Sequence, residues 1–505
     1  MVAVIDIGAS SIRMAIAQIN NGKIKVLERL IQGVALGKDT FHYGSIKKNT
    51  IEDCVRVLRS YRKKLEEYQI TQMDKVRVVA TSAVRESSNR VAFTDRIYSS
   101  TGLLVEPIDD AEVNRVTYLG ILPLLRADPD LFSSLAMVVE VGGGSTETLL
   151  LKGGDVVHAQ AYRLGSLRLR ETLSNYSAPA MDSRRIMEAQ IDRTIDQMRE
   201  VADDKQIQLV ALGGDVRFAA SQLIGDSSEP IARIPISDLE VFTDQMLSMS
   251  VDQIVNRYHM TLSDAETLGP ALLTYLHVAR EFGIPEILVA EFNLRGALLN
   301  EMAGHDGWAV GFSEQILHSA RKLARKYHVA LPRAEHIASL ATTLFEQLGE
   351  EHGLSARWKT ILNAAALLHE TGLYVSTRSY HKHSMYIINN SKIFGLSPFD
   401  IRLVSLVARY HRQAHPKPSH EGYSSLDRDN RIAVSKVAAI LRLAVCLDHS
   451  RSQRIRSLQC EIVDKRLILQ LQGVGDVSLE QLELKQKGQL FDDVFGLRVM
   501  LRPVR

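Results

Sequence analysis

Two glycine-containing hairpins of the same design, about 130 residues apart, constrain this 505-residue chain more than any other feature. The first reads VAVIDIGASSIRMAIAQI and the second reads MVVEVGGGSTETLLL. In each, an apolar stretch typical of a buried strand leads into a turn of Gly and Ser and then into a second apolar strand. Such a turn directs backbone N–H groups and hydroxyl groups toward one point, which suits a phosphate group.

The residue types in the two turns support this interpretation. Glycines at Gly8 and at Gly142 to Gly144 lack the Cβ that would prevent close approach of an anion to the backbone. Side-chain hydroxyl donors accompany them, at Ser10, Ser11, Ser145 and Thr146.

The segments that follow the two hairpins also repeat in order. Each hairpin is followed by a further strand, a helical stretch and another strand. These segments are residues 23–30, 50–68 and 76–80 in the first half and residues 156–162, 183–202 and 208–212 in the second. Both halves are therefore predicted to be β-β-β-α-β units. Two similar α/β lobes that face each other place their hairpins on opposite walls of a cleft, where small molecules commonly bind.

Composition places the chain among ordinary globular proteins. It is 45% hydrophobic and 24% charged, and its length accommodates three domains of roughly 150 residues. No segment approaches the ~20 apolar residues that span a bilayer, and no signal peptide is evident, so we expect a cytoplasmic protein that does not bind membranes. The cysteines, Cys54, Cys446 and Cys460, are too widely spaced to predict disulfides or a thiolate zinc site.

The small net charge of +2 conceals an asymmetry. Residues 304–505 hold 28 Lys and Arg but only 19 Asp and Glu, whereas residues 1–303 carry a net negative charge. Twelve of the 16 histidines also lie in the C-terminal part. A basic, histidine-rich module favours an extended polyanion as ligand, although positive charge spread over a solvated surface is an equal alternative. No nucleic-acid-binding motif is present, so no nucleic acid is expected as a partner.

Breaks in periodicity predict four segments. We expect a first lobe at residues 1–125, a second at 126–303, a helical domain at 304–457 and a small β-rich segment at 458–505. The last segment contains the alternating stretches LILQLQ and LRVMLRPV, which predict strands.

The segments DIGASSIRM, ATSAVRESSN, EVGGGSTE and YHKHSMYII, in this order, resemble the Ppx/GppA family of exopolyphosphatases and guanosine pentaphosphate phosphohydrolases. The resemblance covers essentially the whole chain. It implies two actin-like lobes, of the sugar kinase, Hsp70 and RNase H type, followed by a helical HD-like domain with a small C-terminal α+β segment. It also implies removal of terminal phosphate from polyphosphate or guanosine pentaphosphate, usually with Mg²⁺, and a homodimer.

The resemblance and the turns together predict a phosphate site. Arg85 follows a predicted strand by one short turn, so we expect its guanidinium to bind phosphate oxygens bidentately at the mouth of the cleft. The third glycine turn, Gly213-Gly214, either faces the phosphates or is needed only for a strand-to-helix connection. The predicted phosphate-binding residues are Gly8, Ser10, Ser11, Thr81, Ser82, Arg85, Gly143, Gly144, Ser145, Gly213 and Gly214.

Two glutamates are predicted to be catalytic. By resemblance, Glu112 in IDDAEVNR falls at the family's catalytic glutamate. The family pattern is Ile-Ser-Gly followed by paired glutamates. This segment departs from the pattern, because Val113 replaces the second glutamate of the pair. From the residues alone, a glutamate in the first turn of a helix usually interacts with the helix dipole. Glu147 resembles the family's second catalytic carboxylate.

The resemblance also implies a site for Mg²⁺ or another divalent cation, with Asp6, Glu140 and Glu147 as ligands. Glu140 stands where the family usually has Asp, and the additional methylene displaces the carboxylate outward by roughly the tolerance of an octahedral Mg²⁺ site.

In the C-terminal domain, His369-Glu370 replaces the His-Asp pair of HD phosphohydrolases, which favours polyanion binding over a metal site. The predicted polyanion path is Lys382, His383, Arg409, His411 and Arg412.

The sequence therefore predicts a hydrolase of the exopolyphosphatase type that releases terminal orthophosphate by water attack in the cleft between the lobes. A guanosine pentaphosphate 5′-phosphohydrolase, a kinase of the same lobe architecture and a non-catalytic polyphosphate or alarmone-binding regulator remain as alternatives. No motif for the adenosine pocket of a kinase is evident.

Overall fold

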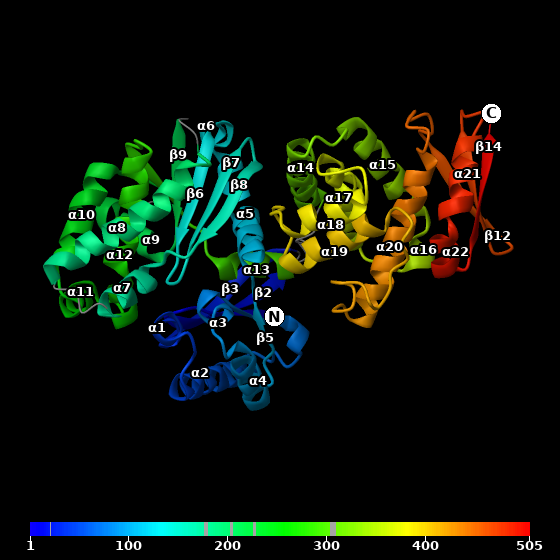
Figure 1. Ribbon diagram of the computed structural model, residues 1–505. Helices are drawn as coiled ribbons and strands as arrows, with labels where there is room; N and C mark the ends of the chain where they lie inside the picture. The colour runs from blue at the N-terminus through cyan, green and yellow to red at the C-terminus, as the bar shows by residue number, and fades with distance from the viewer. Residues whose placement is uncertain (21, 176–179, 203–205, 226–228, 304–309, 505) are drawn as a thin grey trace. The chain divides into compact units, whose positions relative to one another are not determined.

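The structure, a computed structural model, describes residues 1–505 apart from 21, 176–179, 203–205, 226–228, 304–309 and 505 (Figure 1). The chain forms two compact units, residues 1–307 and 308–505. The domain boundary predicted at residue 303 adjoins residues 304–309, which lie outside the described ranges. Within those ranges, none of the helices is long and apolar enough to cross a membrane.

The first lobe is built on a five-stranded sheet. Its strands are β1 (Val2–Ile7), β2 (Ser11–Asn20), β3 (Lys23–Gly33), β4 (Val76–Ala80) and β5 (Val105–Pro107). They are ordered β3-β2-β1-β4-β5: β2 pairs antiparallel with both β1 and β3, β4 pairs in parallel with β1, and β5 pairs in parallel with β4. Helix α2 (Lys48–Glu67) buries Cys54, Leu58 and Leu65 in the core of this lobe.

The second lobe repeats this sheet. Its strands are β6 (Leu135–Val141), β7 (Thr146–Lys152), β8 (Asp155–Tyr162), β9 (Ile207–Leu212), β10 (Ile231–Pro235) and β11 (Glu286–Ala290). In the order β8-β7-β6-β9-β11 they match the first lobe strand for strand, and β10 adds an antiparallel edge. With α2 and α8 (Ala180–Arg199) in equivalent places, the predicted β-β-β-α-β duplication is confirmed.

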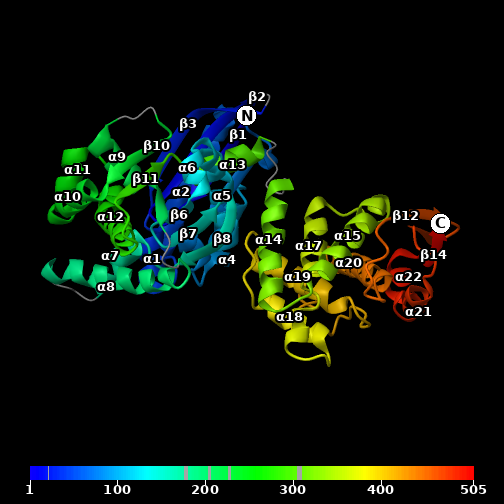
Figure 2. The ribbon, with the colours of Figure 1, turned by 90° about the horizontal axis from the view of Figure 1, so that it is seen from above.

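Two helices lie between the sheets of the first unit (Figures 1 and 2). Helix α5 (Asp110–Ala127) contacts β7 and β8, and α13 (Leu294–Met302) contacts β1, β2 and α5. A Cβ on Gly120 of α5 would lie 2.3 Å from the ring of Phe292, so this glycine permits the close packing. The N-terminal turns of both helices are thereby held beside the glycine turns.

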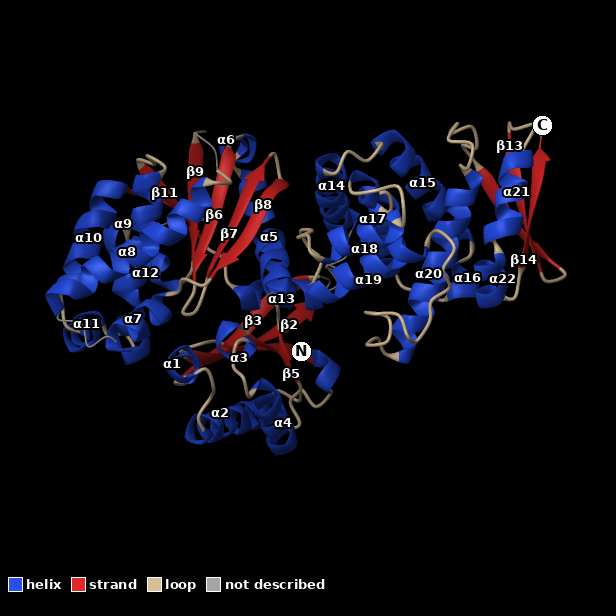
Figure 3. Cartoon of the chain, in the orientation of Figure 1, coloured by secondary structure: helices blue, strands red, loops and turns tan. Residues whose placement is uncertain are grey.

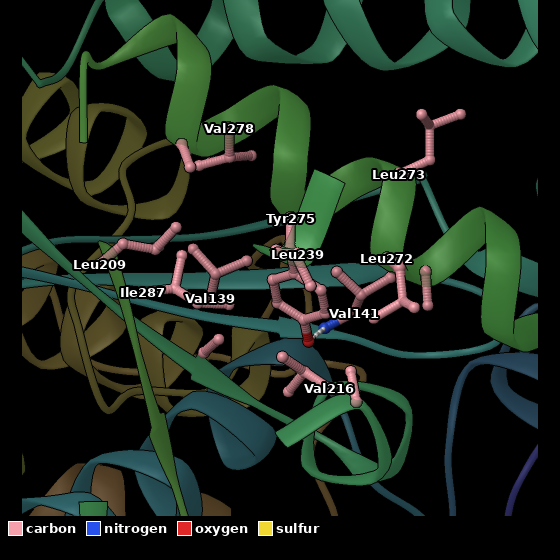
Figure 4. Close-up of a cluster of buried hydrophobic side chains, with 14 of the residues drawn as sticks. Val139, Val141, Leu209, Val216, Leu239, Leu272, Leu273, Tyr275, Val278 and Ile287 are labelled. Carbon is pink, nitrogen blue, oxygen red and sulfur yellow. Dashed lines mark hydrogen bonds between the residues drawn. The ribbon is translucent and has the colours of Figure 1, made fainter. Parts of the chain in front are cut away.

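A buried tyrosine ties the core of the second lobe to its strand ends. Tyr275 lies on α12 (Leu262–Glu281), among apolar side chains of the sheet and the helices (Figure 4). Its hydroxyl accepts a hydrogen bond from the backbone N–H of Val141 at 2.8 Å and donates one to the carbonyl oxygen of Leu212. Because both residues directly precede glycine turns, Tyr275 fixes the positions of two turns at once.

The second unit is helical and ends in a small sheet (Figure 3). Its principal helices are α14 (Val310–Lys326), α15 (Leu331–Gln347), α17 (Ala356–Leu368), α18 (Tyr380–Asn389), α19 (Pro398–Tyr410) and α20 (Arg428–Leu447). The sheet has the order β12 (Leu458–Val463), β13 (Arg466–Gln472), β14 (Arg498–Val504), with α21 (Ser478–Lys487) and α22 (Gln489–Phe495) between its last two strands. Strands therefore form at the predicted LILQLQ and LRVMLRPV stretches.

One residue of the predicted polyanion path is buried. His411 is 1% exposed, its Nδ1 donates to the carbonyl oxygen of Ala408 and its Nε2 is 3.0 Å from the hydroxyl of Tyr380. Burial, followed by the nearby His369, holds the pKa of His411 well below its ordinary value. His411 is therefore a neutral core residue, and the prediction that it binds a polyanion is wrong.

In this unit, a buried arginine lies between two carboxylates, one of them from the His369-Glu370 pair that replaces the His-Asp pair of HD phosphohydrolases. The Nε of Arg333 donates to Asp448 at 3.1 Å, and its Nη1 donates to Glu370 at 2.5 Å. Both carboxylates are buried, and the guanidinium group of Arg333 already neutralises their charge. Across the described residues no three His, Cys, Asp or Glu side chains are arranged to hold a metal ion. These residues do not fit the metal of an HD phosphohydrolase.

We predict that replacing Tyr275 by Phe lowers the free energy of unfolding of the first unit by about 1–3 kcal/mol. The substitution leaves a buried N–H and a buried carbonyl oxygen without their partner. Tyr61→Phe is the matched control, since Tyr61 is equally buried but donates only to the carbonyl oxygen of Ile12. Urea unfolding of both variants measures the difference, and an equal or larger loss for Tyr61→Phe would contradict the assigned role.

The buried imidazole of His411 predicts a pH-dependent stability. Its pKa is lowered in the folded state, whereas the unfolded chain protonates near the ordinary value of about 6.5. Below that pH the unfolded state binds the additional proton, so stability present above pH 6.5 is lost as the pH falls. The unfolding temperature should decrease from pH 7 to pH 5, less steeply in His411→Gln than in the wild type. Identical slopes would disprove this assignment.

Candidate active site

A cavity of about 550 Å³ lies between the two lobes of the first unit. The turns after β1, β6 and β9 line it, together with the segment after β4 and the N-terminal ends of α5, α12 and α13. All but one of the predicted phosphate-binding residues face it, namely Gly8, Ser10, Ser11, Thr81, Ser82, Arg85, Gly143, Ser145, Gly213 and Gly214. The predicted metal ligands Asp6, Glu140 and Glu147 also line it.

The two hairpin turns meet at this cavity. A Cβ placed on Gly143 would lie 3.1 Å from the Cβ of Ala9, and one on Gly144 would lie 2.4 Å from Ser82 Oγ and from the ring of Phe41. Gly144 itself does not line the cavity, because it packs against the first lobe. A glycine at position 144 is therefore required for contact between the lobes.

The carbonyl oxygens of both turns accept hydrogen bonds from backbone N–H groups of flanking segments. In the first lobe, Ala9 accepts from Gly37 N at 2.7 Å and Ser10 accepts from Val34 N at 2.9 Å. In the second, Gly142 accepts from Ser166 N at 2.9 Å and Gly143 accepts from Arg168 N at 3.0 Å.

These donors lie at or just before the first turns of two helices in equivalent places, α1 (Leu36–Tyr43) and α7 (Ser166–Asn175). Because the carbonyl oxygens are drawn toward them, the turns offer backbone N–H groups and hydroxyls to an anion.

Four guanidinium groups line the cavity, from Arg13, Arg85, Arg217 and Arg295. Arg85 is anchored by Ile108 O at 2.9 Å and Asp110 at 2.5 Å, and Arg295 by Asp6 at 3.1 Å. The Nε of Arg13 is buried and has no hydrogen-bond partner among the described residues. Sequence reasoning missed Arg13, although the alternation of β2 places it on the same face as Asp6, its partner in register.

Two glutamates face each other across β6 and β7. Glu140 and Glu147 are paired directly in register, and Ser145 donates to Glu147 at 2.5 Å. Burial, and secondly the charge of Glu140, raises the pKa of Glu147 to about 8. Burial raises the pKa of Glu140 to about 7. Like charges directly opposite on neighbouring strands repel, so the pair favours a proton or a cation between them.

The carboxylates that line the cavity fit Mg²⁺ if substrate phosphates complete its coordination. Mg²⁺ commonly takes one or two carboxylates and completes its octahedron with water and substrate phosphates. Glu140 and Glu147 supply such a pair, whereas Asp6 is engaged by Arg295. The residues therefore suit a cation that binds together with phosphate.

Glu112 does not line the cavity. Its carboxylate accepts from Arg115 at 2.7 and 2.8 Å and from Arg77 at 3.0 Å, and both arginines also bind Glu301 of α13. Burial alone would raise the pKa of Glu112, but the two guanidinium groups lower it. A carboxylate saturated by donors and directed away from the cavity is poorly suited to accept a proton from water. The geometry argues against the role of general base expected for Glu112.

The end of the cavity near α9 (Gly214–Ile224) has an aromatic wall. Phe218 of α9 and Tyr258 of α11 (Val251–Tyr258) meet edge to face with ring centroids 5.4 Å apart, and Met260 lies beside them in the lining. The buried Phe242 supports both rings from behind at 6.4 Å. This wall was not predicted, because its aromatic residues are distant in sequence and belong to no motif.

The remaining residues of the predicted polyanion path form a basic cluster in the second unit. Lys382 is exposed, and Arg409 and Arg412 are half-buried, without a carboxylate partner among the described residues. Burial and then the charges of Arg412, Lys382 and Arg409 lower the pKa of the neighbouring His381 to about 4. The cluster thus concentrates positive charge, and His383 lies on the same helix.

Two models of one protein family match the chain. A sequence model described as the Ppx/GppA phosphatase family matches residues 15–305, and one described as Ppx/GppA phosphatase, domain III, matches residues 317–488.

Curated relatives cover nearly the whole chain. A protein of Pseudoalteromonas atlantica named guanosine-5′-triphosphate,3′-diphosphate pyrophosphatase is 24% identical over 476 residues, which cover 92% of this chain and 89% of the relative. A protein of Photobacterium profundum with the same name is 22% identical over 502 residues, which cover 96% of this chain and 95% of the relative.

A solved structure supports the fold. The crystal structure of an exopolyphosphatase from Cytophaga hutchinsonii is 21% identical, with a TM-score of 0.53, and the match covers 60% of this chain and 97% of that chain. Since the family model spans more than half of the residues, the chain belongs to the Ppx/GppA phosphatase family, whose named members are phosphoanhydride hydrolases.

Proposed function

We propose that this protein hydrolyses the terminal phosphoanhydride bond of inorganic polyphosphate and releases orthophosphate. The observation that carries the proposal is that two glycine turns, whose carbonyl oxygens are bonded by flanking backbone N–H groups, meet at a cavity lined by four arginines. Backbone donors and guanidinium groups that converge on one point suit a phosphate chain, because every phosphate unit of the chain is negatively charged.

In the proposed mechanism, a water molecule attacks the terminal phosphorus while the bond to the bridging oxygen breaks. Ser10, Ser11 and the turn N–H groups hold the terminal phosphate, and Arg85 stabilises the charge that spreads over its oxygens. Glu147 orients the water and accepts its proton, since it lines the cavity and the Ser145 hydroxyl fixes its carboxylate.

Glu140 and Glu147 are the residues that would hold Mg²⁺, which would neutralise phosphate charge and keep both carboxylates ionised until Glu147 accepts the proton of the water. The protein contributes the paired carboxylates and the position of the phosphate chain beside them.

The aromatic wall favours guanosine pentaphosphate as a second candidate substrate. Phe218 and Tyr258 offer apolar ring surface at one end of the cavity, and purine bases stack on such surfaces. Two relatives are named for a guanosine nucleotide, which agrees with this alternative.

For the second unit, we propose that Lys382, His383, Arg409 and Arg412 bind the body of a long phosphate chain. Unpaired positive charge in one cluster supports this role. The predicted homodimer remains a prediction, for which sedimentation equilibrium is the direct measurement.

Glu147→Gln should lower the rate of phosphate release from polyphosphate by about 10²–10⁴-fold. Glu112→Gln should stay within about threefold of the wild-type rate while losing about 1–3 kcal/mol of stability, because it disrupts an ion-pair cluster outside the cavity. Orthophosphate release with Mg²⁺ and with a chelator, together with thermal unfolding, measures both effects. Abolished activity in a folded Glu112→Gln protein would contradict the assignment.

Replacing Phe218 by Ala should distinguish the two candidate substrates. If a guanine base stacks on the wall, the variant loses about 1–3 kcal/mol of affinity for guanosine pentaphosphate and retains its affinity for tripolyphosphate. Calorimetric titration of both ligands gives the comparison, and Arg412→Ala serves as a matched variant that should weaken only long polyphosphate. Equal affinity of wild type and Phe218→Ala for guanosine pentaphosphate would eliminate the nucleotide alternative.

A further inference from the structure

The first turn of α5 directs two adjacent side chains to different surroundings. Glu112 is bound by Arg77 and Arg115 outside the cavity, whereas Val113 lines the cavity. The N-cap Asp109 accepts from Glu112 N at 2.9 Å and fixes this orientation. In an α-helix successive residues are about 100° apart, so only one of the two can face the cavity.

Val113 lies close to the predicted phosphate-binding arginine. Arg85 donates to Ile108 O and pairs with Asp110, and both belong to the segment that starts α5. The side chain of Val113 is 9% exposed and stands in the same wall as Thr81, Ser82 and Arg85. Position 113 therefore faces the place where the terminal phosphate is expected.

The carboxylates around the cavity are unevenly distributed between the lobes. Glu140, Glu147, Asp215 and Asp264 come from the second lobe. From the first lobe, Asp6 alone among the described lining residues is acidic, and Arg295 binds it. Among its described lining residues, the first lobe thus presents hydroxyl, guanidinium and apolar groups, but no unengaged carboxylate.

We propose that Val113 limits water activation in this protein, because it places an apolar side chain where a carboxylate would face the terminal phosphate. This inference rests on the proposed function. An isopropyl group neither orients water nor accepts a proton, so the reaction depends on Glu147 alone. A second carboxylate at position 113 would reach the same cavity from the opposite lobe.

The chemistry with a glutamate at position 113 balances in the same way as in the proposed reaction. The water oxygen bonds to the terminal phosphorus, and the bond from phosphorus to the bridging oxygen breaks. The proton of the water passes to the new carboxylate, and the shortened phosphate chain leaves with the bridging oxygen.

The test compares Val113→Glu with Val113→Gln, which has the same size but no basic carboxylate. Val113→Glu should release orthophosphate from tripolyphosphate with Mg²⁺ at least about tenfold faster than the wild type, and Val113→Gln should show none of this gain. Adding Glu147→Gln to Val113→Glu should leave measurable activity, because the new carboxylate substitutes for the lost one. Val113→Asp provides a second, shorter carboxylate should Val113→Glu unfold, as judged by thermal unfolding.

Two results separate this inference from the proposed function. In the first, the wild type hydrolyses tripolyphosphate, and folded Val113→Glu and Val113→Asp bind it equally well but hydrolyse it no faster. This result would overturn the role of Val113 alone. Absence of phosphate release in the wild type and in all variants, for polyphosphate and guanosine pentaphosphate alike, would overturn the proposed function and this inference with it.

Discussion

The contact between the two glycine turns is the constraint on which the site depends. Gly165, at the start of α7, leaves no room for a Cβ, which would lie 2.4 Å from the backbone of Gly144. The second turn is thereby pressed between its own lobe and Phe41 and Ser82 of the first lobe. Because the carbonyl oxygens of both turns are bonded by flanking backbone, one local design, used twice, produces the donor-lined cavity.

Duplication explains how much of the fold the sequence predicts. The hairpins, the helical stretches and the strands after them are local signals, and the structure repeats them in equivalent sheets. The family resemblance predicts Asp6, Glu140 and Glu147 as neighbours, and all three line one cavity.

Features that depend on distant parts of the chain were not predictable. Glu112 is removed from the cavity by Arg77 of β4, Arg115 and Glu301, and its helical position alone does not reveal these partners. His411 resembles a surface histidine in a basic segment, but tertiary packing buries it. The aromatic wall unites α9 and α11, whose residues share no motif.

The central claim is that both turns hold a single phosphoryl group. The most direct test is a crystal structure of the protein soaked with orthovanadate and Mg²⁺. The account predicts one vanadate between the turns, in contact with backbone N–H groups of both lobes, with Glu147 closer to it than Glu112. Vanadate bound to only one turn, or located beside Glu112, would contradict the account.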